Sequence, residues 1–332
     1  MNGTPSEQSI ICIGSPVVDQ IVQVPESFLQ DVDGDKGGME LVDAKHLERL
    51  QASLPVPPMQ AAGGSAGNTA FALARLNMPS RFLGMVGADA PGTYYRELFR
   101  RFGGDDRAIR THGSLPTAQC LSLVTPDGER TMRTHLGAAT TLNPEDITVE
   151  DFQGSAHAHV EGYLLFNPDL ITHVLHSAKA AGCSVSLDLA SFEVVKASQD
   201  MLPGLLDDYV DIIFANEEEA EAFTGDPEPE KNISVLARHA ETVAVKLGAR
   251  GALLRHGDRG LKVSARPVDQ VVDTTGAGDL WAAGFLFGLF RNRDLDRCGE
   301  YGAALGSAVV TCQGASLTDE QWDRFRVDFA DC

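Results

Sequence analysis

The chain has 332 residues, of which 43% are hydrophobic, so it can bury a substantial core and is not a disordered chain. Its 27 Lys and Arg against 47 Asp and Glu give a net charge of −20, which disfavours binding to nucleic acid or to an anionic membrane. Six scattered cysteines without a CxxC pair are typical of reduced thiols in a cytosol. Because the segment Met1 to Gln8 is polar and has no Lys or Arg, we expect no export signal and predict a cytoplasmic protein.

The first predicted element is a buried strand over Ser9 to Ile13, an apolar run that ends at Gly14. Asp19 follows among apolar neighbours, just before a second predicted strand over Ile21 to Val24. An acid in an apolar setting needs a partner, because burying an unpaired charge is costly. Asp19 therefore either caps a turn or binds a ligand, and its position alone leaves both explanations open.

A glycine-rich segment, Gly63 to Asn68, precedes a predicted helix of small residues over Thr69 to Leu76. Gly63 and Gly64 have no Cβ, so the backbone can approach a ligand closely at this point. A flexible loop would use the same residues. The segment by itself is compatible with a binding site and with a plain connection.

Two alternating runs, Thr117 to Thr125 and Glu129 to His135, flank the turn sequence Pro126-Asp127-Gly128 and predict a β-hairpin. Together with strands between Val17 and Val42, this hairpin can form a small sheet separate from the main one. We expect that sheet to act as a lid.

Four strand-like runs then alternate with helical segments, which is the rhythm of βαβ units. They are His157 to Glu161, Cys183 to Asp188, Val210 to Ala215 and Thr242 to Leu247. The pattern predicts an α/β fold built on a doubly wound, mostly parallel sheet.

Polar residues stand at the carboxyl ends of these strands, where open α/β sheets bind ligands. Glu161 ends one strand, and Asn216 follows another and begins the acidic turn Asn216-Glu217-Glu218-Glu219. Acids in the first turn of a helix complement its macrodipole by about 0.3–1 kcal/mol each, so this turn alone does not require a ligand.

The stretch Asp273-Thr274-Thr275-Gly276-Ala277-Gly278-Asp279 precedes an almost wholly apolar helix over Leu280 to Phe290, which we expect to begin at Gly278 or Asp279. The first N–H groups of a helix have no internal partner, and glycines allow close approach, so Gly276 to Asp279 can form an anion pocket. Asp279 is then either a helix cap or a general base beside that pocket.

Spacing excludes two other phosphate-binding motifs. The P-loop string GxxxxGK[ST] occurs nowhere, and a dinucleotide-binding GxGxxG would need a small residue where Trp281 stands. The remaining pattern, DTxGAGD, resembles the second signature of the ribokinase-like (PfkB) carbohydrate and nucleoside kinases. The segment Gly63 to Asn68 resembles their first signature, GGxxxN, and the spacing of Asn216 and Glu219 resembles their NxxE motif.

The resemblance covers the chain from about Ile10 to about Leu317. It implies one domain over residues 1–332, with a three-layer α/β/α fold around a doubly wound, mostly parallel sheet. The lid would be discontinuous and span approximately residues 17–43 and 117–136. The implied activity is that of an ATP-dependent kinase, a phosphotransferase with an alcohol group as acceptor, which uses ATP, Mg²⁺ and, in many relatives, K⁺.

The resemblance also implies a role for each motif residue. Asp279 would accept the proton of the attacking hydroxyl, while the amides of Gly276, Ala277 and Gly278 stabilise the developing charge. The implied substrate ligands are Asp19, Gly63, Gly64, Asn68 and Glu161. The implied nucleotide-side residues are Asn216, Lys246, Gly248, Gly251 and Thr275. Glu219 would organise Mg²⁺ through water, and Asp273, beside the loop Thr311 to Ala315, would hold the monovalent cation.

The acceptor is open between a free sugar and a nucleoside. Ser65 stands where the ribokinase signature GGKGAN has Lys, whereas KGGMELVD from Lys36 and RTMRTHLGA from Arg130 resemble stretches of adenosine-kinase-like bacterial sugar kinases. A nucleobase would need an aromatic wall, but the predicted lid offers a single ring, Phe28. Its other apolar residues are Val22, Met39, Leu41, Leu121 and Met132. We therefore expect phosphorylation of the primary hydroxyl of a free sugar, with adenosine or another nucleoside as the alternative.

Two other classes of function agree less well with the sequence. A regulatory module that binds sugar or nucleotide would not need the acid Asp279, and a phosphate hydrolase would need an activated water and no lid. We expect small-molecule partners, no nucleic acid, no membrane, and a homodimer in which exposed lid strands pair between two chains.

Overall fold

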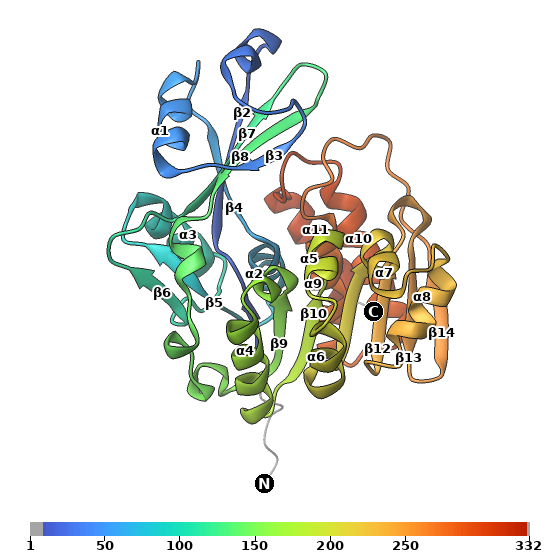
Figure 1. The fold of residues 1–332 in the computed structure, drawn as a ribbon. Coiled ribbons are helices and arrows are strands. Elements are labelled where there is room, and N and C mark those ends of the chain that lie inside the picture. The colour runs from blue at the N-terminus through green and yellow to red at the C-terminus, as the bar shows by residue number, and fades with distance from the viewer. Residues whose placement is uncertain (1–8, 331–332) are drawn as a thin grey trace.

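The structure is a computed structural model that describes residues 9–330. The segment Met1 to Gln8, in which we expect no export signal, lies outside the described residues, and so does Cys332. Within the described range the chain folds into two sheets and the helices that cover them (Figure 1). No helix of residues 9–330 is long and apolar enough to span a bilayer.

The large sheet has nine strands within residues 9–330, in the order β14-β13-β12-β11-β10-β9-β1-β5-β6. In chain order these strands are β1 (Ser9–Ile13), β5 (Ser80–Gly87), β6 (Ile109–His112), β9 (Ser155–Glu161), β10 (Ser184–Asp188), β11 (Ile212–Asn216), β12 (Thr242–Lys246), β13 (Ala252–His256) and β14 (Arg259–Val263). The strands from β12 to β6 pair in parallel, whereas β13 and β14 form an antiparallel edge. The predicted doubly wound, mostly parallel sheet is therefore confirmed.

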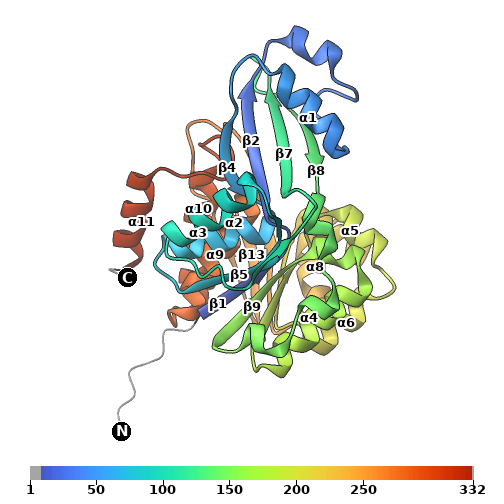
Figure 2. The same cartoon turned by 90° about the vertical axis from the view of Figure 1, so that its left-hand side faces the viewer.

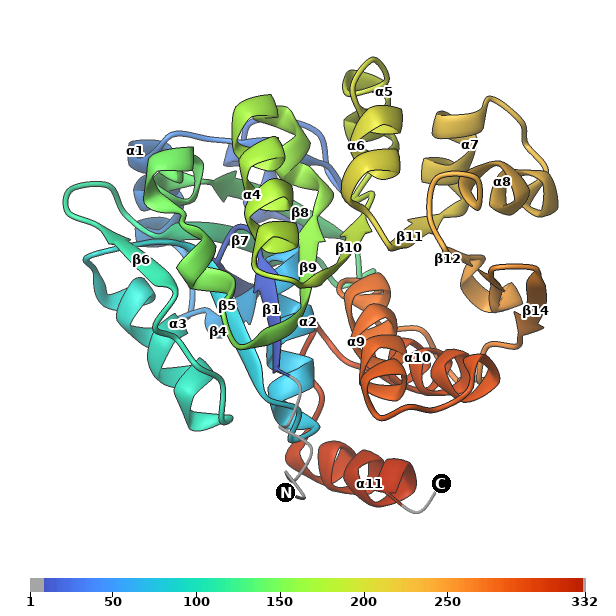
Figure 3. The ribbon, with the colours of Figure 1, turned by 90° about the horizontal axis from the view of Figure 1, so that it is seen from below.

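Helices cover both faces of this sheet and give three layers (Figure 3). On one side lie α2 (Ser65–Arg75), α3 (Ala90–Arg101), α9 (Ala277–Phe290), α10 (Leu295–Val309) and α11 (Asp319–Ala330). On the other lie α4 (Pro168–Ala180), α5 (Phe192–Ala197), α6 (Leu202–Tyr209), α7 (Glu217–Thr224) and α8 (Pro229–Leu236). In β1, Ile10 and Cys12 pack into the first core, and Ile11 and Ile13 pack into the second. A strand covered on both faces must be apolar throughout, which explains its uninterrupted apolar run.

The small sheet projects beyond the carboxyl ends of the parallel strands (Figures 1 and 2). Its strands within the described range, in spatial order, are β3 (Met39–Leu41), β8 (Arg130–His135), β7 (Ala118–Val124), β2 (Val17–Gln23) and β4 (Met59–Gly63). Helix α1 (Ala44–Ser53) covers one face, where Leu47 and Leu50 pack on Val22, Leu121 and Leu123.

The face of the small sheet opposite α1 carries Asp19. Strand registers place Leu41, Thr134, Cys120 and Asp19 side by side in one row across β3, β8, β7 and β2. Directly paired residues of neighbouring strands share a face, so an apolar side chain and a carboxylate stand at opposite ends of this row.

The predicted hairpin and core strands occur within two residues of their predicted ends. Asp19, which we placed just before the second strand, lies inside β2, and the helix expected from Gly278 or Asp279 begins at Ala277. Strands β4, β6, β13 and β14 were not predicted. The sequence of β4, MQAAG, contains no β-branched residue, so strand propensity could not reveal it.

Candidate active site

The N-termini of α2 and α9 meet, and the carboxylate of Asp279 lies between them. Asp279 Oδ1 accepts a hydrogen bond from Ser65 Oγ, and Oδ2 accepts one from Asn68 Nδ2, both over 2.8 Å. Thr69 Oγ1 donates to the backbone carbonyl of Asp279 over 3.1 Å. The two glycine-containing motifs, far apart in the sequence, therefore build one site and fix both oxygens of the acid.

Asp279 does not cap its helix. The N-cap of α9 is Gly276, with φ 75°, and no side chain caps this end. Burial raises the pKa of Asp279 to about 6, although the hydrogen bond from Asn68 opposes the rise. Of the two explanations that the sequence left open, the structure removes capping and leaves a carboxylate that is more basic than usual.

Two backbone amides at the start of α9 are available for an anion. No residue in the described part of the chain accepts a hydrogen bond from the amides of Gly278 and Asp279. The Ala277 amide, which we predicted to face the anion, donates to the Thr274 carbonyl over 3.2 Å and is already engaged. A Cβ at Gly278 would lie 3.0 Å from Lys246 Nζ, so an ammonium group stands next to this turn.

Lys246 forms an ion pair with Asp188, a residue that the sequence did not single out. Lys246 Nζ lies 2.8 Å from Asp188 Oδ2, and both side chains are almost fully buried. Burial opposes the charge on Lys246, but Asp188 and Glu219 outweigh it and raise the pKa of this lysine. Asp188 ends β10 as Glu161 ends β9, and the two residues are paired. This position at the carboxyl end of a strand is the signal that could have identified Asp188.

Asp19 lies on the inner face of the small sheet, directed at the same region. Burial raises its pKa to about 7, with Arg130 opposing the rise and Asp273 and Asp279 adding to it. No hydrogen bond joins its carboxylate to a residue in the described range, so it caps no turn. A Cβ at Gly63 would come within 2.3 Å of Asp19 Oδ2, so glycine leaves room for this acid.

Glu161 is buried and holds two backbone segments together. Its carboxylate accepts hydrogen bonds from the amides of Ser15 over 2.8 Å and of Ala66 over 3.2 Å, the latter at the start of α2. Burial raises its pKa to about 7, and these amides lower it. Gly64 beside it has φ 87°, and a Cβ there would lie 2.0 Å from the Ser15 carbonyl oxygen.

Asn216 and Glu219 bond to each other as a reciprocal cap of α7. Asn216 Oδ1 accepts from the Glu219 amide over 2.9 Å, and Glu219 Oε2 accepts from the Asn216 amide over 2.7 Å. Burial raises the pKa of Glu219 to about 7, and Asp188 adds to the rise. Among the described residues no three His, Cys, Asp or Glu side chains are grouped to hold a metal. Both Glu219 oxygens accept hydrogen bonds from Asn216, so Glu219 would reach a magnesium ion only through water, with phosphate oxygens as the direct ligands of the ion.

The loop between β12 and β13 contains Gly248 and Gly251. Gly248 has φ 56° and opens a short 3₁₀ turn, while a Cβ at Gly251, with φ 92°, would meet the Val263 carbonyl oxygen at 1.9 Å. Arg250 in this turn pairs with Glu217 at the start of α7. The predicted nucleotide-side segments therefore lie next to each other.

The expected monovalent-cation site contains a guanidinium group. Arg130 of β8 donates from Nη1 to Oδ1 and Oδ2 of Asp273 over 2.7 and 2.6 Å and also bonds to Thr275 Oγ1. The amides of Thr275 and Gly314 donate to the same carboxylate over 2.9 and 2.7 Å. With its oxygens engaged in this way, Asp273 does not fit a bound K⁺ as we expected.

Tyr163 was missed by the sequence reasoning. It lies on the 3₁₀ helix Gly162–Phe166 directly after Glu161, and its side chain is 46% exposed. Burial raises its pKa to about 12, and the nearby charges of Glu161 and Asp279 add to this rise. Tyr163 therefore lies within electrostatic reach of the acidic groups of the site. Its position after a strand that ends in Glu161 was the available signal.

This fold and site are those of a small-molecule kinase. A small sheet lies over the carboxyl ends of a doubly wound sheet, and a carboxylate of raised pKa lies beside unpaired amides at the start of a helix. The chain belongs to the pfkB family of carbohydrate kinases, whose family model matches residues 47–322. These kinases are phosphotransferases. Both the predicted family and the predicted fold are confirmed.

Relatives of known structure and name include sugar and nucleoside kinases. Adenosine kinase from Sinorhizobium meliloti is 33% identical, with a TM-score of 0.85 over 97% of this chain and 99% of that chain. A probable sugar kinase from Rhizobium etli CFN 42 is 31% identical, with a TM-score of 0.84 over 98% and 99%. Ribokinase from Arabidopsis thaliana is 32% identical over 268 residues, 76% of this chain and 68% of the relative.

Proposed function

We propose that this protein transfers the γ-phosphoryl group of ATP to the primary hydroxyl of the ribose unit of a nucleoside, adenosine foremost. The observation that carries the kinase chemistry is Asp279, fixed by Ser65 and Asn68 beside the free amides of Gly278 and Asp279 itself. Base and anion pocket lie within one helical turn, where an in-line transfer needs them.

Asp279 acts as the general base. Its raised pKa makes it a stronger proton acceptor than an exposed aspartate, while at neutral pH it is still largely ionised. Ser65 and Asn68 hold its orientation, and this reduces the motion needed before proton transfer.

The phosphoryl group is stabilised by the free amides and by Lys246, which stands next to Gly278. Asp188 keeps Lys246 charged inside the protein. Glu219 and Asp188 would hold the water shell of Mg²⁺, which supplies charge neutralisation to the phosphates when it is bound. Asp19, whose carboxylate has no hydrogen-bond partner in the described range, accepts hydrogen bonds from ribose hydroxyls.

The side chains that surround this site bear on which acceptor it can hold. Phe28, the one ring expected near the ligand, packs into the core under α1 and does not face the site. The ring of Tyr163 comes instead from the 3₁₀ helix that follows β9 of the large sheet. On the small sheet, Met39 and Leu41 of β3 leave 57% and 64% of their surfaces exposed and lie on the same face as Asp19.

The strand register of the small sheet sets the distance between its apolar residues and Asp19. Leu41 shares its row with Asp19 and stands three strands away, about 14 Å at 4.8 Å per strand. A carboxylate for the ribose and an apolar wall at this separation suit a sugar that carries a flat apolar base. The 33% identical relative named adenosine kinase agrees with this proposal.

A free sugar, the acceptor that we favoured from the sequence, is the second candidate. In its favour, Met39 and Leu41 are aliphatic, so the inner face of the small sheet contributes no ring to stack on a base.

A coupled ADP-release assay over adenosine, other nucleosides, ribose and fructose distinguishes the two. We expect the highest kcat/KM with a nucleoside, and Asp279→Asn serves as the inactive control. A higher kcat/KM for any free sugar than for every nucleoside would replace the first proposal with the second.

A further inference from the structure

The ion pair between Arg130 and Asp273 joins the small sheet to the loop that precedes α9. Arg130 belongs to β8 and Asp273 to the segment before Gly276, 143 residues later. Their side chains are 13% and 5% exposed. Arg130 Nε also donates to Ser122 Oγ over 2.8 Å, which fixes the guanidinium on the inner face of the small sheet.

Both carboxylate oxygens of Asp273 already accept hydrogen bonds, from Arg130 and from backbone amides. Burial would raise its pKa, but the amides of Thr275 and Gly314 and the charge of Arg130 hold the pKa below its usual value. A cation from solution would have to displace the guanidinium, which makes two charge-assisted hydrogen bonds.

We propose that Arg130 is a built-in cation, which takes the position at Asp273 of the expected monovalent ion and places its charge beside the turn that begins α9. The inference rests on the proposed function. Asp273 and Thr275, which Arg130 binds, lie within three residues of Gly276, the left-handed N-cap of α9. The positive charge that orders this turn is thus attached to the lid and does not depend on an ion from solution.

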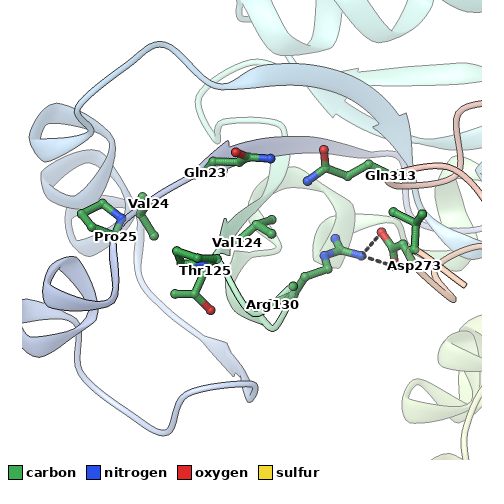
Figure 4. Close-up of a pocket in the computed structure, with 11 residues that line it drawn as sticks. Gln23, Val24, Pro25, Val124, Thr125, Arg130, Asp273 and Gln313 are labelled. Carbon is green, nitrogen blue, oxygen red and sulfur yellow. Dashed lines mark hydrogen bonds and ion pairs between the residues drawn. The ribbon is translucent and has the colours of Figure 1, made fainter. Parts of the chain in front are cut away.

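The pocket beside the ion pair makes the proposal testable by substitution. It has a volume of about 560 Å³ and is lined by Gln23, Gln313, Arg130 and Asp273 with apolar neighbours. Figure 4 shows Arg130 reaching Asp273, with the carboxamides of Gln23 and Gln313 facing the same space. If Arg130 is replaced by a neutral side chain, a buried carboxylate is left without its cation, and a hydrated ion can enter from this pocket.

The experiment compares the wild type, Arg130→Gln and Lys36→Met in KCl, NaCl and tetramethylammonium chloride at one ionic strength. Two quantities are measured: kcat/KM for ATP and the thermal unfolding temperature. Lys36 is the matched control, because it is a cation just before β3 whose ion pairs, with Glu26 and Asp127, do not include Asp273. We expect the wild type and Lys36→Met to vary less than about twofold among the salts. We expect Arg130→Gln to lose activity in tetramethylammonium and to recover at least about tenfold in KCl, with a higher unfolding temperature.

Activation of the wild type by K⁺ of more than about fivefold over tetramethylammonium would overturn the proposal. So would an Arg130→Gln protein that responds to K⁺ in neither quantity. An Arg130→Gln protein that folds only in KCl supports the proposal. If this variant folds in none of the salts, the K⁺ response of the wild type decides the question. If no acceptor is phosphorylated, the proposed function fails, but the unfolding temperatures still test the built-in cation.

Discussion

Asn68 Nδ2 donates a hydrogen bond to Asp279 Oδ2 over 2.8 Å and so ties the first turn of α2 to the first turn of α9. The two residues are 211 positions apart. The bond is charge-assisted, and it fixes the acid at the place where the free amides of α9 begin. The predicted general base and a predicted substrate residue are therefore direct neighbours.

Asp279→Asn should lower kcat by about 10²–10⁴-fold, because Asn cannot accept the proton of the attacking hydroxyl. The fold should survive. The folded-state pKa of Asp279 is raised, so its ionisation destabilises the fold as pH rises through about 6, and neutral Asn removes that effect. Steady-state kinetics and thermal unfolding at about pH 8 test both statements. Near-wild-type turnover of a folded variant would remove Asp279 from the base role.

The kcat/KM of the wild type should fall as pH drops through about 6, because protonated Asp279 cannot act as a base. Ser65→Ala removes a hydrogen bond that lowers this pKa, so the acidic limb should move to higher pH. Ser234→Ala is the control, since its hydroxyl bonds to the Glu230 carbonyl on the exposed side of α8. Profiles between about pH 5 and pH 9 measure the limb, and identical limbs in Ser65→Ala and wild type would contradict the assignment.

Glu219→Gln should raise the Mg²⁺ concentration needed for half-maximal rate, because it removes a negative charge that is buried next to Asp188 and Lys246. Glu217→Gln should change this concentration little, since Glu217 is paired with Arg250 at the surface. Magnesium titrations of the two variants make the comparison. Equal responses would mean that the acidic turn is only a helix end.

Tyr163→Ala should lower kcat/KM for nucleosides by about tenfold or more, because stacking on an aromatic ring contributes roughly 1–3 kcal/mol per base. With ribose as the acceptor, the variant and the wild type should differ in kcat/KM by less than about twofold. Ribose has no base to stack on the ring, so it loses no stacking energy. The ribose rate is thus an internal control. Equal losses with both acceptors would show that Tyr163 supports the site as a whole and not the base.

Gly64→Ala should destabilise the fold by about 2 kcal/mol or more, because a Cβ would meet the Ser15 carbonyl at 2.0 Å in addition to the cost of a left-handed backbone. Gly182→Ala is the matched control: its φ is 85°, but nothing lies within 4 Å of the added atom, so about 1 kcal/mol is expected. Urea unfolding compares the two. An equal loss of stability would show that the contact with Ser15 relaxes without cost.

The fold class and most of the motifs could be predicted because they depend on local pattern. The apolar run of β1, the alternating hairpin of β7 and β8 and the glycines before α2 and α9 are each contained in a few consecutive residues. Spacing excluded the other phosphate motifs and located Asp279 at a helix start, which the structure confirms. The roles of these residues in catalysis stay predictions.

The partners of those residues were decided by the tertiary structure. Ser65 with Asp279, Asp188 with Lys246, and Arg130 with Asp273 are each separated by 58 or more residues, and no local pattern records such a pairing. Which acid accepts a proton and which is neutralised depends on the charges and donors that the fold brings within about 3 Å. For that reason the sequence alone indicated an anion pocket and a cation site, whereas the three-dimensional arrangement determined that the cation site holds an arginine of this chain.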